Sequence, residues 1–482
     1  MPAATGPKPT GPVPPGPVPP GPTASRTEAE TSAARGSRRR RRGGASEAGA
    51  AAEGAPPPVP TDEGLLVPVD IARAQARVRF DTSTRQADVE ATVELRVGDV
   101  PGRPLFDLRQ EVDEVSFDGA RLPAEAVRHR STGAGADARM RAVDIECEAR
   151  SSHLLRLRYR LGEPAATGAN PVDWAPAGDG VRFDLWMSDL EPGRYLEMWL
   201  PANLCHDRFS LELAVEVVGT DRPHLLLANG EVEEGGTRRS WAVRYPASYT
   251  SLSPMLVLAP VDEVETARSE ARCAGRTLEV VVAALPEAAA DVPAAAADTS
   301  AWLSYFGSRY GDWAHGDRFL AVLWGPGRGM EYDGATTASE AALEHEIFHS
   351  WFGRGVKPAG ARDGWMDEAM ATWATASSRA TGARFASAEL GLDEAPVELR
   401  PAHPWARHTP REAYAGGARL LSGVAEMAGG AGRLRAALAD WHSRYGGRAA
   451  TSDDLCRHLS TWCGTDLRPW WDRYVDGGRP AG

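Results

Sequence analysis

The chain has 482 residues, of which 42% are hydrophobic and 25% are charged, and its formal net charge is −12 at pH 7. An acidic protein lacks the basic face that phosphate backbones require, so we expect no nucleic acid as its main partner. The number of cysteines, five, is odd, and no two of them have the short sequence spacing of a metal-binding pair. The sequence therefore argues against both a disulfide framework and a zinc ribbon.

Residues 1–62 form a segment of biased composition. Pro, Gly, Ala, Ser, Thr and Arg dominate it, and it has almost no Leu, Ile or Phe, so it cannot bury enough apolar surface to offset the entropy of ordering. We predict a disordered arm. No apolar segment follows its arginine run at 38–42, and no stretch of about 18 apolar residues occurs anywhere. We therefore expect neither an export signal nor a transmembrane helix, and a cytoplasmic location.

Residues 63–262 have the texture of strands. Apolar and polar side chains alternate in several runs, among them Val89–Val97, Leu155–Leu161 and Phe209–Val217. A period of two places one face of a strand in a core and the other in water. Clusters of Gly, Pro and Asp separate the runs at short spacing. This half is therefore predicted to be an antiparallel β-domain with one solvated face.

The texture changes near residue 262, where we place a domain boundary. Leu278–Val282 and Phe319–Trp324 are typical of short strands, whereas Pro286–Trp313 is rich in alanine and favours a helix. Helical patterns dominate the remainder of the chain. The sequence therefore predicts a mixed α/β domain over residues 263–482 and the fold class α+β.

A His-Glu-x-x-His motif lies in this second half, at His345, Glu346 and His349. On a helix, residues four apart lie on the same face, so both imidazoles can bind one cation. Thr337 and Glu340 have the spacing of a capping box, which would begin the helix. Glu346 lies beside the metal face and can accept a proton from a zinc-activated water.

Glu368 supplies a third candidate ligand. Eighteen residues separate it from His349, and the segment Gly364–Trp373 favours a second helix that can lie against the first. Two imidazoles and one carboxylate leave a fourth position open, which is the arrangement of a catalytic zinc. The sequence thus predicts one Zn²⁺ per chain, held by His345, His349 and Glu368.

The motifs His345–Gly353 and Trp365–Glu368 resemble the zinc signature of the aminopeptidase N-like family of gluzincin metallopeptidases. Gly329–Tyr332 resembles that family's Gly-x-Met-Glu-Asn segment, and Tyr414–Ala418 resembles its Tyr-x-Lys-Gly-Ala segment. In the β-rich half, Ser188–Arg194 resembles Thr-Gln-x-Glu-Pro-x-x-Ala-Arg. The resemblance implies a saddle-like N-terminal β-domain followed by a thermolysin-like catalytic domain.

The resemblance also implies a site for the substrate amine. Glu331 would bind the free α-amino group with Glu191 beside it, and Gly329 and Met330 would line the substrate site. Asp189 stands where the family has Gln, so three carboxylates would surround the amine. Such a cluster would favour a cationic first side chain, Arg or Lys, unless mutual repulsion protonates one carboxylate.

The implied activity is that of a zinc-dependent aminopeptidase acting on peptides with a free N-terminus. Glu346 would be the general base, and Tyr414 would donate to the tetrahedral oxyanion, with Tyr332 as its competitor. Three alternatives stay open: an endopeptidase, a hydrolase of another substrate such as an epoxide, and a non-catalytic peptide-binding protein. The preferred first residue, the peptide length and the oligomeric state are not indicated by the sequence.

Overall fold

In the computed structural model of the chain, the described residues are 54–478 except 136–138, 165–169, 185–186, 189, 192, 238, 326, 328 and 379–395. They belong to one compact unit, Glu47–Gly482, and the description below concerns that unit. Residues 1–53, most of the predicted arm, lie outside the described residues. Within the described ranges, no helix combines the length and apolar character that a membrane span requires.

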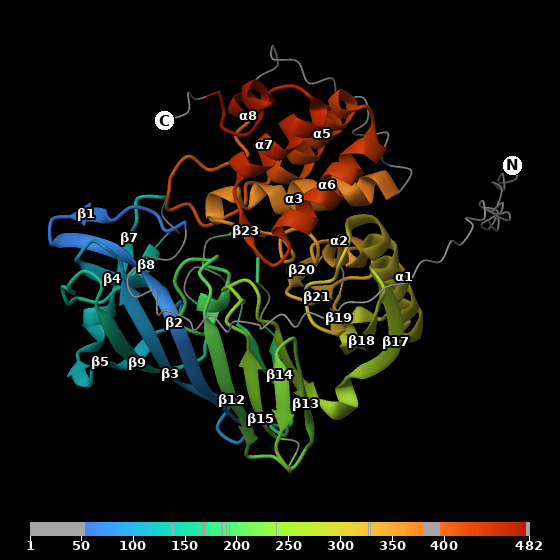
Figure 1. Cartoon of the computed structure of the whole chain (residues 1–482). Helices are drawn as coiled ribbons and strands as arrows, with labels where there is room; N and C mark the ends of the chain where they lie inside the picture. Colours follow the sequence, from blue (N-terminus) through green and yellow to red (C-terminus); the bar gives the residue numbers. More distant parts are fainter. Residues whose placement is uncertain are drawn as a thin grey trace, which may run out of the picture. The chain divides into compact units, whose positions relative to one another are not determined.

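Strands dominate the first half of the unit, coloured blue to green in Figure 1. A twelve-stranded sheet has the order β14-β15-β12-β2-β3-β9-β5-β6. Off this order, β1 and β4 pair with β2, β8 pairs with β4, and β7 pairs with β8. A four-stranded sheet has the order β10-β11-β16-β13. The strands are β1 Val59–Thr61, β2 Gly64–Asp81, β3 Gln86–Val97, β4 Arg103–Phe106, β5 Val112–Phe117, β6 Ala120–Leu122, β7 His129–Ser131, β8 Arg139–Ala142, β9 Ser152–Arg160, β10 Val172–Trp174, β11 Val181–Asp184, β12 Ser210–Val218, β13 His224–Ala228, β14 Glu231–Glu234, β15 Ser240–Tyr245 and β16 Leu256–Pro260.

The strands predicted from alternation are present as β3, β9 and β12, whose buried and exposed side chains alternate. Most neighbours pair antiparallel, as predicted. However, β2 pairs parallel with both β12 and β4, so the sheet is mixed rather than purely antiparallel. Alternation of side chains fixes the faces of a strand but not the direction of its neighbour, which explains this difference.

The predicted end of the arm at residue 62 is too late. Residues 59–61 form β1, which pairs antiparallel with the start of β2. Farther upstream, Trp405 Nε1 donates a hydrogen bond to the Pro57 carbonyl at 2.8 Å. Both contacts use main-chain groups of the segment, and the Val59 side chain also packs against a small apolar cluster.

The second half combines a sheet with helices, coloured olive to red in Figure 1. A five-stranded sheet has the order β17-β18-β19-β21-β20, and β22 pairs with β23. The strands are β17 Glu265–Cys273, β18 Arg276–Ala284, β19 Arg318–Leu323, β20 Gly329–Tyr332, β21 Ala335–Ala338, β22 Lys357–Pro358 and β23 Ala449–Ala450. The helices are α1 Val292–Tyr310, α2 Leu343–Phe348, α3 Trp365–Ser378, α5 Glu412–Ala428, α6 Ala431–Tyr445, α7 Ser452–Cys463 and α8 Arg468–Tyr474.

The elements predicted early in this half are present with shifted ends. The two strands are β18 and β19, but α1 begins at Val292 rather than at Pro286, which lies in a short 3₁₀ turn. Asp291 caps α1 by accepting a hydrogen bond from the Ala294 N–H at 3.0 Å. An aspartate at the N-cap satisfies an otherwise unpaired amide, which explains why the helix begins there.

Two apolar clusters meet at the five-stranded sheet. Along β18, Val281 and Ala283 belong to the cluster of the β-rich half, whereas Val280 and Val282 belong to the cluster under the helices. The sheet is therefore buried on both faces, which accounts for its nearly continuous apolar strands. The domain boundary at residue 262 falls between β16 and β17, and it stays a prediction.

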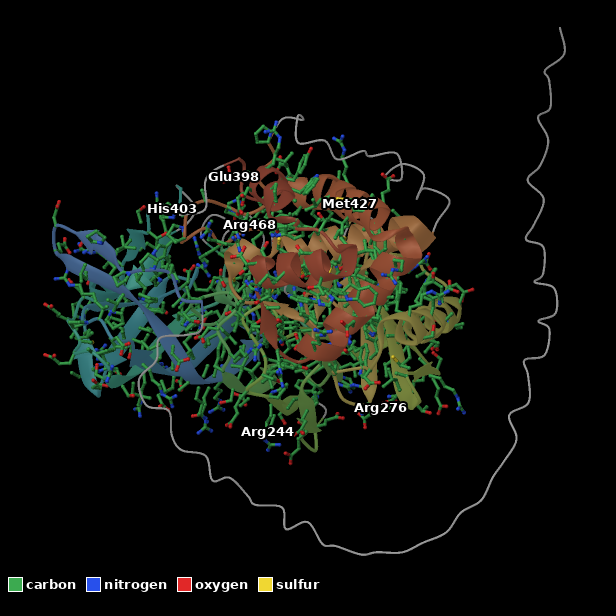
Figure 2. All side chains as sticks on the ribbon, turned by 45° about the horizontal axis from the view of Figure 1, so that its top comes forward. Arg244, Arg276, Glu398, His403, Met427 and Arg468 are labelled. Carbon is green, nitrogen blue, oxygen red and sulfur yellow. The ribbon has the colours of Figure 1, made fainter. Side chains whose placement is uncertain are left out.

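Charged side chains surround these cores, for example Arg244 on β15 and Arg276 on β18, which are exposed and point outward in Figure 2. All five cysteines lie in the described part of the chain, and they are free thiols, as the sequence predicts. Apolar packing and polar networks, without disulfides, thus hold the functional residues in place.

Candidate metal centre

The His-Glu-x-x-His motif lies on α2 and at its C-terminal end. His345 is inside the helix, and His349 is the C-cap residue with helical dihedrals, φ −56° and ψ −19°. The one-turn spacing is therefore kept, and the two ring centroids are 4.8 Å apart. The predicted capping box is wrong: Thr337 belongs to β21, and Ala342 precedes α2 without a side-chain cap. The backbone at Thr337 is extended because it pairs with the strands on both sides.

Glu368 on α3 completes the predicted triad. Its Oε2 lies 3.0 Å from His345 Nε2 and 3.8 Å from His349 Nε2. One ligand atom from each residue falls within 4.8 Å of the others. Bonds of about 2.1 Å at tetrahedral angles separate two zinc ligands by roughly 3.3 Å, so these distances suit one shared cation.

His349 shows that the donor set fits a zinc ion. Its Nδ1 is hydrogen-bonded to Asp367 Oδ1, which keeps a proton on Nδ1 and makes Nε2 the nitrogen that can bind a cation in place of a proton. That Nε2 is buried and has no hydrogen-bond partner among the described residues. A buried ring nitrogen without a partner is costly, and a cation bound to it removes that cost. A carboxylate behind a metal-binding histidine is the usual arrangement at zinc sites.

The electrostatics of the triad also favour a cation. Burial lowers the pKa of His345 to about 3, so its imidazole is neutral and can ligate. Burial raises the pKa of Glu368 to about 8, against the opposing charge of His349. Burial would also lower the pKa of His349, but the carboxylates of Asp367, Glu331 and Glu368 together raise it. A bound cation would replace these protons and keep the ligands in their binding forms.

Glu346, the predicted base, lies beside the ligands and is 7% exposed. Its carboxylate, a nitrogen of His349 and an oxygen of Glu331 lie within 4.8 Å of one another. A Cβ at Gly329 would stand 2.2 Å from Glu346 Oε1, so only glycine lets this carboxylate lie against β20. Gly329, predicted to line the substrate site, is thus required to make room for the base.

Tyr414 reaches the same centre from α5. Its hydroxyl donates to Glu368 Oε1 at 2.7 Å, and its ring stacks near the ring of His345 at 6.2 Å and 10°. Helices α3 and α5 approach closely at Gly417, because this residue has no side chain. A Cβ there would stand only 2.4 Å from the Cβ of Ala369. The structure therefore places the Tyr414 hydroxyl next to a carboxylate of the candidate triad.

Strand β20 also carries Met330 and Tyr332, which are 2% and 1% exposed in the cluster of the β-rich half. Core packing accounts for both side chains. The burial of Tyr332 disfavours it as a rival of Tyr414, whose hydroxyl contacts Glu368 of the candidate triad. A substrate-lining role for Met330 stays a prediction.

Glu331 is held by an arginine that the sequence analysis did not single out. Arg354 Nη2 donates to Glu331 Oε1 at 2.6 Å, and both side chains are almost fully buried. Burial alone would raise the pKa of Glu331, but the charge of Arg354 lowers it below its ordinary value. Arg354 Nη1 also lies 3.8 Å from Asp367 Oδ2. A signal was present, since Arg354 interrupts a mostly apolar segment directly after the histidine motif.

Glu191 is paired with an arginine of its own segment. Its side chain is 49% exposed and lies 3.0 Å from Arg194 Nη1. The expectation that Glu191 and Glu331 bracket one ammonium group stays a prediction. Asp189, the proposed third carboxylate, lies outside the described residues. Of the three proposed carboxylates, Glu331 is the one whose oxygen lies within 4.8 Å of His349 and Glu346 ligand atoms, and the role of the three together stays a prediction.

Several solved structures share this fold. A variant of the M1 zinc metallopeptidase from Deinococcus radiodurans aligns with a TM-score of 0.61 and 18% identity, over 86% of this chain and 96% of that chain. The same protein bound to a Tyr-Ser-Ala substrate gives 0.60 and 19%, over 86% and 95%. Aminopeptidase A from Legionella pneumophila, in complex with aspartic acid, gives 0.60 and 14%, over 84% of this chain and 49% of that chain.

The chain has the fold of the M1 zinc metallopeptidases. At the level of the fold, this confirms the resemblance that the motifs indicate. No protein-family model and no curated protein sequence matches the chain. The saddle-like and thermolysin-like character of the two halves stays a prediction, and the activity is argued below from the site itself.

Proposed function

We propose that the chain is a zinc-dependent peptidase that hydrolyses peptide bonds at the N-terminal end of peptides, with one zinc held by His345, His349 and Glu368. The observation that carries this proposal is the convergence of three donors on one point, where His349 Nε2 is buried without a hydrogen-bond partner among the described residues. Three protein ligands, rather than four, are typical of catalytic zinc. The peptide bound in the Deinococcus structure supports a peptide substrate.

Each neighbouring side chain has a task in such a reaction. Zinc at this site would polarise the scissile carbonyl and acidify a water. Glu346 accepts the proton of that water and returns it to the departing amine, since its carboxylate lies beside the ligands. Asp367 holds His349 in the tautomer that ligates.

Tyr414 is the proposed donor to the developing oxyanion. Its hydroxyl stands at hydrogen-bond distance from Glu368 Oε1, and a rotation about the side chain can redirect it toward a substrate oxygen near the same ligand. Removal of one such donor from an acyl-transfer site costs about 10²–10³-fold in kcat. A non-catalytic role for the chain is disfavoured because all three ligands, the base and this donor are present together.

The proposal is tested by measuring zinc content and peptidase activity together. A panel of aminoacyl fluorogenic amides and short peptides is assayed with the intact protein, with the chelator-treated protein and after zinc is restored. We expect about one zinc per chain and activity that follows the zinc. Full turnover in chelator-treated protein that contains no zinc would contradict the mechanism.

A further inference from the structure

The carboxylate at the amine end of the site is already matched by a cation of the chain. An oxygen of Glu331 lies within 4.8 Å of ligand atoms of Glu346 and His349, and this carboxylate is the proposed contact for the first nitrogen of a peptide substrate. Yet its Oε1 accepts from Arg354 at 2.6 Å, and the two side chains are only 4% and 3% exposed. Glu191, the other proposed anchor, is likewise paired with Arg194.

The position of Arg354 is fixed by its surroundings. Its Nε also donates to the Glu331 carbonyl at 3.3 Å, and its Nη1 donates to the Gly353 carbonyl at 3.3 Å. Gly353 has φ +101°, and a Cβ there would be 1.9 Å from Asp367 Oδ1, so the main chain before Arg354 is held against Asp367. A guanidinium cannot lose its proton in a protein, which makes the positive charge permanent.

A compensated carboxylate differs from an isolated one in what it binds. An isolated carboxylate attracts an ammonium group strongly in a buried site, because the interaction is poorly screened there. When a guanidinium is bound to one carboxylate oxygen, an ammonium group bound to the other oxygen is repelled by the guanidinium, because both carry a positive charge. A neutral amide N–H can still donate to the free oxygen without that repulsion.

We propose that Arg354 neutralises Glu331 and thereby makes the site accept peptides whose first nitrogen is a neutral amide, namely acylated N-termini and internal peptide bonds, nearly as well as free amines. This inference rests on the proposed zinc peptidase function and widens its substrate class beyond peptides with a free N-terminus. It also opposes the expectation that the site favours a cationic first side chain. Arg354 is a positioning residue here, since it acts through Glu331.

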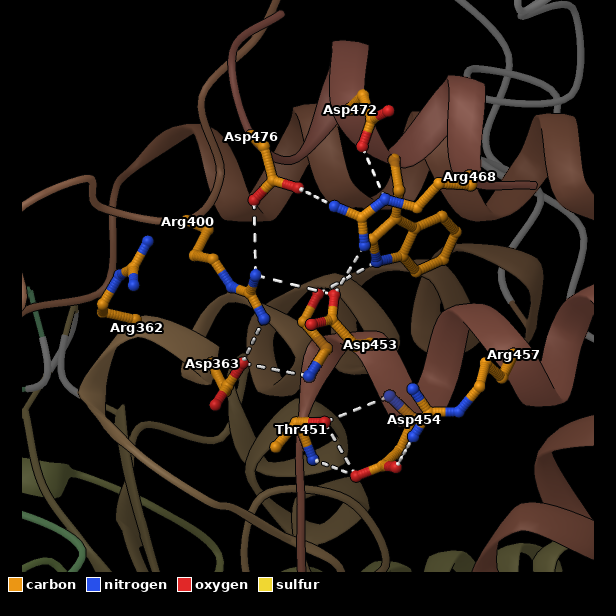
Figure 3. A network of polar contacts seen from close by, with 12 residues as sticks. Arg362, Asp363, Arg400, Thr451, Asp453, Asp454, Arg457, Arg468, Asp472 and Asp476 are labelled. Atoms are coloured by element: carbon orange, nitrogen blue, oxygen red, sulfur yellow. Dashed lines mark hydrogen bonds and ion pairs between the residues drawn. The ribbon is translucent and has the colours of Figure 1, made fainter. Parts of the chain in front are cut away.

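Two substitutions separate the charge of Arg354 from its hydrogen bonds. Arg354→Lys keeps a positive charge near Glu331, whereas Arg354→Gln keeps an N–H donor and removes the charge. Arg400→Gln is the matched control, because Arg400 is another largely buried arginine, paired with Asp363 at 3.1 Å in the network of Figure 3. Arg400 does not contact Glu331, so its loss reports the general effect of removing a buried guanidinium.

The measurement is kcat/KM for matched peptide substrates with free and acetylated N-termini. For the unaltered protein we expect the kcat/KM of the free peptide and that of the acetylated peptide to agree within about tenfold. Arg354→Gln should raise the preference for the free amine by about tenfold or more, mainly through KM of the free peptide. Arg354→Lys and Arg400→Gln should leave the preference within about threefold of its original value.

The outcomes separate this inference from the proposed function. A preference for the free amine above about 100-fold in the unaltered protein would overturn the inference and leave the peptidase function intact. An equal change of preference in Arg354→Lys and Arg354→Gln would overturn the argument from charge. Absence of zinc-dependent cleavage of either substrate would instead contradict the proposed function. Should Arg354→Gln fail to fold, the unaltered protein and Arg354→Lys still decide the question.

Discussion

The two ends of the candidate site differ in how completely the chain satisfies its own polar groups. At the metal end, the buried Nε2 of His349 has no hydrogen-bond partner among the described residues. The same nitrogen lies 3.8 Å from the carboxylate of Glu368. At the amine end, Glu331 has its own arginine at 2.6 Å. One end therefore needs a cation from outside, whereas the other already contains one.

This difference indicates where the binding energy for external groups lies. Buried groups that lack a partner gain most from a ligand, because the cost of their desolvation is already included in the folded state. We therefore expect strong zinc binding at the metal end and weak selection of ammonium groups at the amine end. Five substitutions test this contrast, beginning with the largest expected effect.

His349→Ala removes the ligand with the unpartnered nitrogen and leaves Asp367 without its imidazole. We expect zinc content below about 0.1 per chain and activity at background, since two remaining ligands hold zinc weakly. Metal analysis and peptide turnover provide the measurement. His403→Ala is the control, because His403 is exposed and should change neither value. Retention of a full zinc by His349→Ala would show that the ligand set is different.

Glu346→Gln tests whether the base is distinct from the ligands. The amide cannot accept the proton of a water, so kcat/KM should fall by about 10³-fold. Zinc content should stay near one per chain, because the altered side chain is not among the three ligands. Turnover and metal analysis on the same preparation check both expectations. A loss of zinc would place Glu346 in the coordination sphere.

Glu331→Gln tests the compensation at the amine end through stability. The substitution removes the carboxylate that accepts from Arg354 while the guanidinium stays buried, and breaking a buried pair on one side costs about 3 kcal/mol. Urea unfolding measures the change in the free energy of unfolding. A change below about 0.5 kcal/mol would show that water or other groups screen the pair.

Tyr414→Phe separates two possible tasks of the tyrosine. If the hydroxyl serves the oxyanion, kcat falls by about 10²-fold while zinc affinity is unchanged. If it acts by holding Glu368, to which it donates at 2.7 Å, zinc affinity weakens as well. Single-turnover kinetics and zinc competition with a chelator distinguish the two results.

Glu191→Gln should have the smallest effect. Its side chain is half exposed and its pair with Arg194 is screened by water, so the free energy of unfolding should change by less than about 0.5 kcal/mol. We expect KM for free-amine peptides to stay within about twofold. A larger rise of KM would place Glu191 at the substrate amine after all, as the sequence resemblance implies.

The metal end was predictable because its information is local. The spacing of His345 and His349 survives in α2 and its C-cap, and a one-turn separation on a helix depends only on helical geometry. The gap to Glu368 required a second helix, and α3 begins at Trp365 as the pattern indicates. Alternation in β3, β9 and β12 was equally local and was confirmed.

The misplaced features share a non-local cause. Thr337 has the spacing of a helix cap, but pairing with strands on both sides makes it part of β21. Residues 59–61 follow a segment poor in core-forming side chains, but main-chain pairing with β2 and packing of Val59 against a small apolar cluster order them. Pairing partners come from distant segments, and a propensity summed over neighbouring residues does not include them.

The sequence by itself thus determined the one-turn spacing of the candidate ligands His345 and His349 and the alternation of the strands, because each follows from the repeat of one helix or strand. Only the tertiary structure decided that Arg354 meets Glu331. That contact joins the loop after α2 to β20, which lies at the end of the sheet order β17-β18-β19-β21-β20. An ion pair between two elements depends on which edge each strand takes, and this is set by packing of the whole sheet rather than by any local pattern.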